Sequence, residues 1–257
     1  MLTRAQIQRL AQRNGIGLQA QERDYVQHLL LFLLYRRTQA LIFKGGTALR
    51  VVHRGNRYSE DLDFNGPADM PALQKSWGET VDGLGDFGLA AEIRNTYRSE
   101  ASYTFDVSYQ GPLYDGRDRT KGKVRIDISL RQEEVSTRRV LVTPEYDDLR
   151  PFVVIVLSAE HLFAEKVRAL LVRGKPRDLY DLWLLHAQGV RAENELIQRK
   201  LALYDLELTP KVMEEAFRRA AADWERDLRP LLPQFIPWRD IAPLVEDLLE
   251  LLQATHR

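Results

Sequence analysis

The stretches that decide the fold are FKGGTALR at residues 43–50 and RYSEDLDF at residues 57–64. The apolar run 39–44 is typical of a short buried strand; it stops at Gly45-Gly46, and the next residues predict a helix. Backbone N–H groups of such a turn can approach a phosphate, and a helix N-terminus favours negative charge. The pattern therefore indicates a phosphate site, although a Gly-Gly pair before a helix is more often only a tight turn.

The acidic pair Asp61 and Asp63 follows this turn by one helix. The two residues are two apart on a strand expected within 57–67, so both carboxylates leave the same face. Two carboxylates on one face repel each other unless a cation or a proton intervenes, and Mg²⁺ prefers hard oxygen ligands. A solvated strand edge is the alternative, but the joint pattern of turn and acid pair is rarer than either part.

A third carboxylate, Asp127, lies on a later predicted strand. Residues 123–130 alternate, with apolar side chains on one face and Asp127 on the other; residues 102–110 alternate in the same way, and a long exposed hairpin tip is expected between them. If the Asp127 strand neighbours the strand of the acid pair, three carboxylates converge in a two-metal site. The alternative is an ion pair of Asp127 with Arg125 or another basic residue.

Two charged residues of the second half are predicted to face inward. Lys166 falls inside the apolar stripe of a helix that begins near Glu160, so it needs a partner, which could be a triphosphate or an acid. Asp178 shares a helix face with Leu182 and Leu185. An inward lysine beside an inward acid is either a structural bridge or a catalytic pair, and the pattern leaves both open.

Composition restricts the remaining possibilities. The formal net charge is zero, from 37 basic and 37 acidic residues, so any basic surface must be local. The basic segments 117–140 and 166–177 either line a cleft for RNA phosphates or form solvated faces. There is no cysteine, which excludes disulfides, cysteine-bound zinc and thiol nucleophiles. We expect a cytoplasmic protein that does not span a membrane, because the apolar run 29–34 is far shorter than the roughly 20 residues of a span.

The order of predicted elements indicates two domains. Helices are expected at 3–13, 20–37 and 71–86, interleaved with strands, and the pattern is helical from about residue 158 onward. We therefore predict an α/β domain with N-terminal helices over residues 1–150 and a helical domain over residues 151–257.

Several motifs in order resemble one known family. The chain is similar to the AbiEii/AbiGii nucleotidyltransferase toxins, which include the MenT-like toxins, over roughly residues 20–190. The matching segments are ERDYVQHLLL (22–31), FKGGTALR, RYSEDLDF, SAEHLFAEKVRALL (158–171) and RDLYDLW (177–183). The resemblance implies a polymerase-β-like nucleotidyltransferase domain with a mixed sheet, followed by an α-helical C-terminal domain.

The resemblance also implies an activity. Family members belong to toxin–antitoxin or phage-defence systems and use a nucleoside triphosphate (NTP) and Mg²⁺ to add nucleotides to the 3′ end of tRNA, which blocks translation. The expected genetic partner is an antitoxin with a winged helix-turn-helix domain. The turn reads Gly-Gly-Thr, where Gly-Ser is common across the wider superfamily, and the threonine keeps the hydroxyl.

The predicted site combines the motif positions with the residues found from the pattern. The nucleotide-binding set is Gly45, Gly46, Thr47, Ser59 and Lys166; the metal set is Asp61, Asp63 and Asp127; and the catalytic set is Asp61, Asp127, Lys166 and Asp178. Asp127 matches no family motif and stands on the strand pattern alone. Two other functions stay open: nucleotide transfer to a small molecule or protein, which the neutral net charge motivates, and a non-catalytic NTP-binding module.

Overall fold

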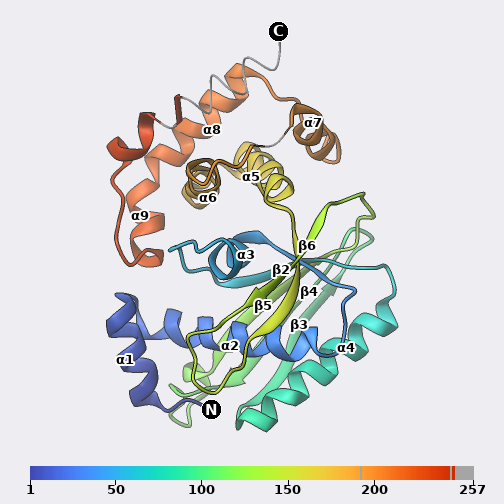
Figure 1. Ribbon diagram of the computed structural model, residues 1–257, viewed down its shortest axis with the longest axis vertical. Coiled ribbons are helices and arrows are strands. Elements are labelled where there is room, and N and C mark those ends of the chain that lie inside the picture. Colours follow the sequence, from blue (N-terminus) through green and yellow to red (C-terminus); the bar gives the residue numbers. More distant parts are fainter. Residues whose placement is uncertain (192, 244, 247–257) are drawn as a thin grey trace. The chain divides into compact units, whose positions relative to one another are not determined.

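The computed structural model describes residues 1–191, 193–243 and 245–246, and it divides into two compact units (Figure 1). Unit 1 is Met1–Leu157 and unit 2 is Ser158–Arg257. The expected division after residue 150 is corrected to one after Leu157. The reason is that the strand Phe152–Leu157 pairs with two other strands of unit 1 and so belongs to its sheet.

Unit 1 is built on a seven-stranded mixed sheet in the order β3-β4-β5-β2-β1-β7-β6, so the predicted mixed α/β architecture is confirmed. β1 pairs antiparallel with β2 and parallel with β7, while β2 pairs parallel with β5. The strands are β1 Ile42–Lys44, β2 Asp61–Asn65, β3 Ala90–Arg98, β4 Ser102–Gln110, β5 Gly122–Ser129, β6 Thr137–Val142 and β7 Phe152–Leu157. The expected hairpin of the two alternating segments is the antiparallel pair β4–β5.

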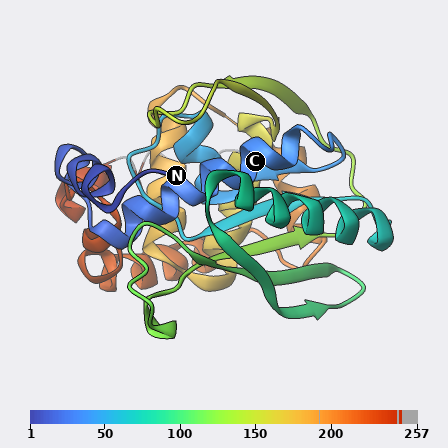
Figure 2. The ribbon, with the colours of Figure 1, turned by 90° about the horizontal axis from the view of Figure 1, so that it is seen from below.

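The apolar face of this sheet is covered by helices that the sequence pattern predicted. The helices of unit 1 are α1 Arg4–Asn14, α2 Leu18–Tyr35, α3 Gly45–Val52 and α4 Met70–Asp82. α2 contacts β5 and β7, and α4 contacts β3 (Figure 2). Trp77 of α4 packs edge-on against Phe64 of β2 and Phe105 of β4, with ring centroids 5.6 and 5.3 Å apart. The polar residues of these strands therefore lie on the opposite face of the sheet.

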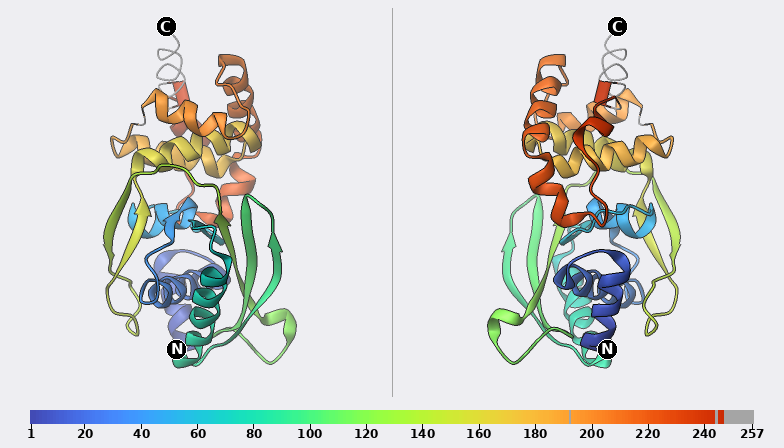
Figure 3. Two further views of the ribbon diagram at one scale, coloured as in Figure 1. Left: turned by 90° about the vertical axis from the view of Figure 1, so that its right-hand side faces the viewer. Right: turned by 90° about the vertical axis from the view of Figure 1, so that its left-hand side faces the viewer.

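The described elements of unit 2 are helices and one short 3₁₀ turn (Figure 3). They are α5 Ala159–Arg173, α6 Pro176–Ala187, α7 Asn194–Ala202, α8 Pro210–Ala222, α9 Trp224–Leu228 and the turn Arg229–Leu231. α5 contacts α6, α7 and α8, so it is the central helix of the unit. Ser158 caps α5 by accepting a hydrogen bond from the backbone of His161, and Gly174 ends the helix in the left-handed conformation. None of the described helices is long and apolar enough to cross a membrane.

Candidate active site

The junction between β1 and α3 is tighter than the sequence pattern suggests. α3 begins at Gly45, directly after β1, so the two glycines form the first turn of the helix and no separate loop precedes it. Gly45 has a φ of 76°, and a β-carbon there would overlap the Asp63 carboxylate. Position 45 therefore requires glycine for its backbone conformation and for its close approach to an acid. The Asp63 carboxylate lies at the end of α3 where the helix dipole favours negative charge.

The next two residues fasten α3 to the segment before β2. A β-carbon at Gly46 would overlap the guanidinium of Arg57 and lie 2.9 Å from the Ser59 hydroxyl, so both side chains pack against this turn. The Thr47 hydroxyl donates a 2.5 Å hydrogen bond to the Asp61 carbonyl, and Thr47 is fully buried. In this arrangement Thr47 positions the helix on β2. Ser59 of the predicted nucleotide-binding set lies beside Gly46.

Arg50, near the other end of α3, forms a buried ion pair that the sequence analysis did not identify. Its Nε lies 2.5 Å from Asp24 Oδ1 of α2, and its guanidinium stacks 3.6 Å above the Tyr58 ring. The Tyr146 hydroxyl donates a 2.6 Å hydrogen bond to the same Asp24 carboxylate. Burial by itself would raise the pKa of Asp24, but His28, Arg50 and Tyr146 outweigh it and lower the pKa. The segments ERDYVQHLLL and FKGGTALR are therefore joined by one charged contact.

The three predicted metal carboxylates share the polar face of the sheet. Asp63 on β2 is directly opposite Asp127 on β5 in the parallel register, and Asp61 is opposite Arg125. Residues paired in this way point to the same side, and the alternating Leu62 and Ile126 are buried on the other. The Asp127 carboxylate forms no hydrogen bond or ion pair with any residue that the structure describes, so the alternative pairing with Arg125 is not formed.

This donor set fits Mg²⁺ in the chemistry of its oxygen atoms. It offers hard carboxylate oxygens on two neighbouring strands. The backbones of such strands are roughly 4.8 Å apart. Within the described ranges, no three acidic or histidine side chains are already gathered as a metal group. One cause is visible at Asp63, whose carboxylate leans against Gly45. The three carboxylates are already on the same face of the sheet, but an ion would have to draw them closer together to be bound by all three.

Lys166 and Asp178 are brought together within unit 2. The Lys166 ammonium lies 3.3 Å from Asp178 Oδ1 and 2.6 Å from Asp181 Oδ2, and Arg173 Nε lies 2.6 Å from Asp178 Oδ2. Asp178 is fully buried. Burial alone would raise its pKa, but Lys166 and Arg173 outweigh this effect and hold the pKa at about 2. This geometry favours the structural-bridge alternative for the pair.

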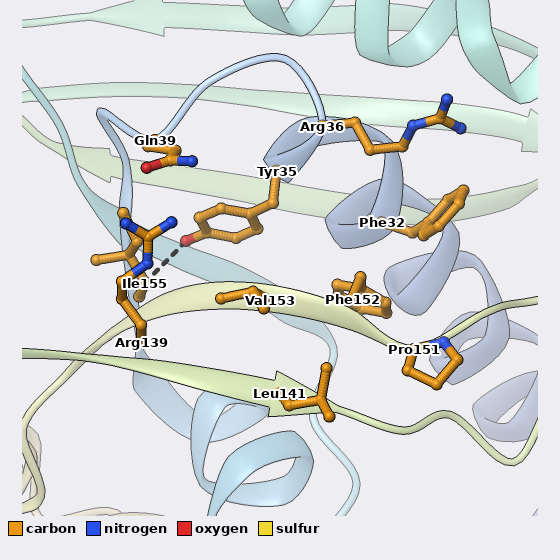
Figure 4. Close-up of a pocket in the computed structure, with 10 residues that line it drawn as sticks. All are labelled: Phe32, Tyr35, Arg36, Gln39, Arg139, Leu141, Pro151, Phe152, Val153 and Ile155. Carbon is orange, nitrogen blue, oxygen red and sulfur yellow. Dashed lines mark hydrogen bonds between the residues drawn. The ribbon is translucent and has the colours of Figure 1, made fainter.

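A cavity of about 330 Å³ lies away from these residues, at the end of α2 (Figure 4). Phe32 and Tyr35 of α2 and Arg36, which directly follows the helix, line one side of it, and residues of the β6–β7 hairpin line the other. The Tyr35 hydroxyl donates a 3.0 Å hydrogen bond to the Ile155 carbonyl. None of the predicted site residues lines this cavity, and its lining contains no carboxylate to hold a metal.

Three solved structures are similar to this chain in fold. MenT4, a nucleotidyltransferase toxin from Mycobacterium tuberculosis, is 21% identical with a TM-score of 0.63, covering 98% of this chain and 99% of that one. A nucleotidyltransferase-like protein from H. pylori is 18% identical with a TM-score of 0.63, covering 94% and 98%. JHP933 from Helicobacter pylori is 17% identical with a TM-score of 0.61, covering 94% and 95%. At these identities the likeness shows the fold.

The family follows from the sequence match. No curated protein matches the chain significantly. The model of the nucleotidyl transferase AbiEii toxin family, type IV toxin–antitoxin system, matches residues 32–251, which is most of the chain and includes the Gly-Gly-Thr turn and the acid pair. The resemblance carried by the motifs is thereby confirmed: the chain belongs to the AbiEii family of nucleotidyltransferase toxins of type IV toxin–antitoxin systems.

Proposed function

We propose that this chain transfers nucleotides from an NTP to the 3′ end of tRNA in a Mg²⁺-dependent reaction and thereby blocks translation. Family membership already gives a nucleotidyltransferase with an NTP substrate and an antitoxin partner. The observation that carries the proposal is the register of Asp63 opposite Asp127, on parallel strands beside the glycine turn of α3. We propose that unit 1 is a polymerase-β-like nucleotidyltransferase domain.

The triphosphate is proposed to bind at the first turn of α3. Gly45 and Gly46 have no side chains of their own, although the Asp63 carboxylate and the Arg57 guanidinium already pack beside them. The N-terminus of α3 favours the negative charge of phosphate oxygens. We propose that the Ser59 hydroxyl, which packs beside Gly46, donates a hydrogen bond to the triphosphate. Thr47 helps to position this site, because its hydroxyl donates a hydrogen bond to the Asp61 carbonyl and so holds α3 on β2.

The acids of the sheet are proposed to hold the metal and orient the acceptor. Asp61, Asp63 and Asp127 would bind Mg²⁺, which when bound neutralises triphosphate charge and acidifies the acceptor hydroxyl. Asp127 accepts the proton of the 3′-hydroxyl as its oxygen attacks the α-phosphorus. The bond from the α-phosphorus to the bridging oxygen breaks, and pyrophosphate leaves with that electron pair. Asp178 is less suited to this role, because a pKa of about 2 makes it a weak base.

Lys166 is proposed to neutralise charge on the leaving pyrophosphate. An ammonium has three N–H donors, and among the described residues Asp178 and Asp181 take up two of them. The two acids would then fix the direction of the third donor, which makes Asp178 a positioning residue for Lys166. A cytoplasmic setting and an antitoxin with a winged helix-turn-helix domain complete the proposal.

An end-labelling assay tests the function. The protein is incubated with total tRNA, Mg²⁺ and each α-³²P-labelled NTP separately, beside Asp61→Ala and the matched surface variant Asp86→Ala of an exposed acid. We expect one NTP to label RNA with wild type and Asp86→Ala but not with Asp61→Ala. Label on protein or a metabolite alone would move the acceptor to another class. NTP binding without pyrophosphate release would indicate a binding module.

A further inference from the structure

The polar face that carries the acid pair continues across three more strands. Asp127 on β5 is opposite Thr104 on β4, and Thr104 is opposite Tyr97 on β3. Since paired residues on neighbouring strands point to the same side, Asp63, Asp127, Thr104 and Tyr97 form one row across the sheet. Tyr97 is therefore two strand spacings, about 10 Å, from Asp127.

Tyr97 reaches this face only because β3 contains a bulge. The pairing of β3 with β4 shifts between Arg94 and Tyr97, so that two residues of β3 oppose one of β4. Arg94 and Tyr97 are three apart and would point to opposite faces of a regular strand, but the extra residue turns both to the polar side. Asn95, within the bulge, has a φ of 52°, and its side-chain amide donates a 2.8 Å hydrogen bond to Asp106. The bulge is thus fixed by a specific contact.

The tyrosine ring is exposed and has cations as neighbours. Tyr97 is 62% exposed, which is unusual for a large aromatic side chain. Arg94 and Arg125 lie on the same face in the adjoining row, Lys123 lies in the row beyond it, and all three are exposed. Glu92 and Asp106 pair with Arg94 and Lys123 respectively. Arg125 forms no ion pair with any part of the chain that the structure describes, so the face retains one uncompensated cation next to Asp61.

We propose that the β3–β4–β5 face binds the single-stranded 3′ end of the RNA acceptor, with Tyr97 stacking on a nucleobase and Arg125 contacting the backbone. This inference rests on the proposed function. An exposed aromatic ring among cations on a sheet face is a means by which proteins hold single strands. The row from Tyr97 to Asp127 lets a base near the 3′ end stack while the terminal hydroxyl lies at the acids.

The incoming NTP also carries a nucleobase, but the geometry favours the RNA. The proposed triphosphate site is at α3, on the β1 side of the acid pair, whereas Tyr97 lies beyond Asp127 on the other side. A cation at Arg125 suits a chain with further phosphates. The acceptor and the donor would then approach the acids along opposite halves of the sheet.

Binding measurements separate the acceptor site from catalysis. The probe is a fluorescein-labelled single-stranded oligoribonucleotide, titrated by anisotropy without NTP against wild type, Tyr97→Ala, Tyr97→Phe and the matched control Tyr114→Ala, which alters a tyrosine outside the three strands. We expect Tyr97→Ala to weaken binding about fivefold or more, Tyr97→Phe to retain it because the ring face remains, and Tyr114→Ala to match wild type. Arg125→Ala should lower the salt dependence of binding.

Steady-state kinetics assign the nucleobase to its source. We expect Tyr97→Ala to raise the KM for RNA and leave the KM for NTP unchanged. A raised KM for NTP with unchanged oligonucleotide affinity would overturn the inference, and so would wild-type affinity in Tyr97→Ala or no binding by wild type. If the oligonucleotide binds through Tyr97 but no NTP labels RNA, the acceptor site stands and the proposed function fails. If RNA is labelled equally well by wild type and Tyr97→Ala, the proposed function stands and the acceptor site fails.

Discussion

The Asp63 carboxylate lies against the α-carbon of Gly45, and this contact makes the strand-to-helix junction dependent on glycine. Gly45→Ala would add a β-carbon that overlaps the carboxylate in a backbone conformation that costs roughly 1–2 kcal/mol for an L-residue. Asp63 must then move away from its place opposite Asp127. We expect nucleotide transfer to fall by about 100-fold, because small displacements of reacting groups have effects of this order.

Gly78→Ala on α4 is the matched control for this change. A β-carbon at Gly78 would meet no atom within 4 Å, and the residue is inside a helix, so alanine should stabilise the fold by about 0.5–1 kcal/mol. Transfer by Gly78→Ala should equal that of wild type. Wild-type transfer by Gly45→Ala would show that the contact with Asp63 is not required.

The periodicity of apolar residues was enough to predict those strands and helices that bury one apolar face and leave the other face polar. The alternation of β4 and β5 places Phe105 and Ile126 in the core, and the run of leucines in α2 makes that helix central. The pattern also separates Asp127 from its apolar neighbours on β5. It could not show that β5 is next to β2, because strand order depends on long-range pairing. That neighbour relation is what brings Asp127 opposite Asp63.

Other parts of the site depend on contacts that no local pattern encodes. Asp24 lies in an apolar helix and Arg50 follows the glycine turn, but only the fold places one on the other. Tyr97 is aimed by a bulge whose position depends on the pairing of β3 with β4. The sequence also did not predict that α3 begins at Gly45, because two consecutive glycines suggest a loop. The contacts of Asp63 and Arg57 with this turn are visible only in the fold.

Asp24→Asn should weaken the fold and the site together. The substitution removes the charge that compensates Arg50 in a buried setting, and breaking such a pair typically costs about 3–5 kcal/mol. The free energy of unfolding from urea titration should fall by this order, and the temperature midpoint with it. The matched control is Arg23→Met, also on α2, whose ion pair with Glu60 is exposed and should be worth under about 1 kcal/mol. Equal losses in both variants would contradict the role of Asp24.

Asp127→Asn should separate catalysis from stability. The Asp127 carboxylate has no hydrogen bond or ion pair to lose within the described chain, so the unfolding midpoint should stay within the error of wild type. The rate of nucleotide transfer should fall by about 10³-fold, because the proposed metal ligand and proton acceptor is lost. Asp86→Asn, at an exposed acid, should change neither quantity. A large loss of stability with a small loss of rate would make Asp127 a structural residue.

Lys166→Met should destabilise unit 2. Without the ammonium, Asp181 loses its 2.6 Å ion pair and Asp178 keeps, among the described residues, only its ion pair with Arg173, so about 3–5 kcal/mol of stability should be lost. Tryptophan fluorescence reports on this unit, because three of the four tryptophans are residues 183, 224 and 238. Lys175→Met, which removes an exposed pair with Asp227, is the matched control and should cost under about 1 kcal/mol. An unchanged unfolding midpoint in Lys166→Met would show that its carboxylate partners do not need it.

The pKa of Asp178 predicts how the stability of unit 2 depends on pH. The pKa is lowered from 3.8 to about 2 in the folded state, so the carboxylate contributes about 2 kcal/mol of stability above pH 4. As the pH falls from 4 towards 2, the unfolded chain binds the proton first and this contribution is lost. The difference in unfolding free energy between wild type and Asp178→Asn should therefore narrow between pH 6 and pH 3, in fluorescence-monitored urea titrations. A difference that stays constant over this range would mean that the ion pairs with Lys166 and Arg173 do not lower the pKa of Asp178.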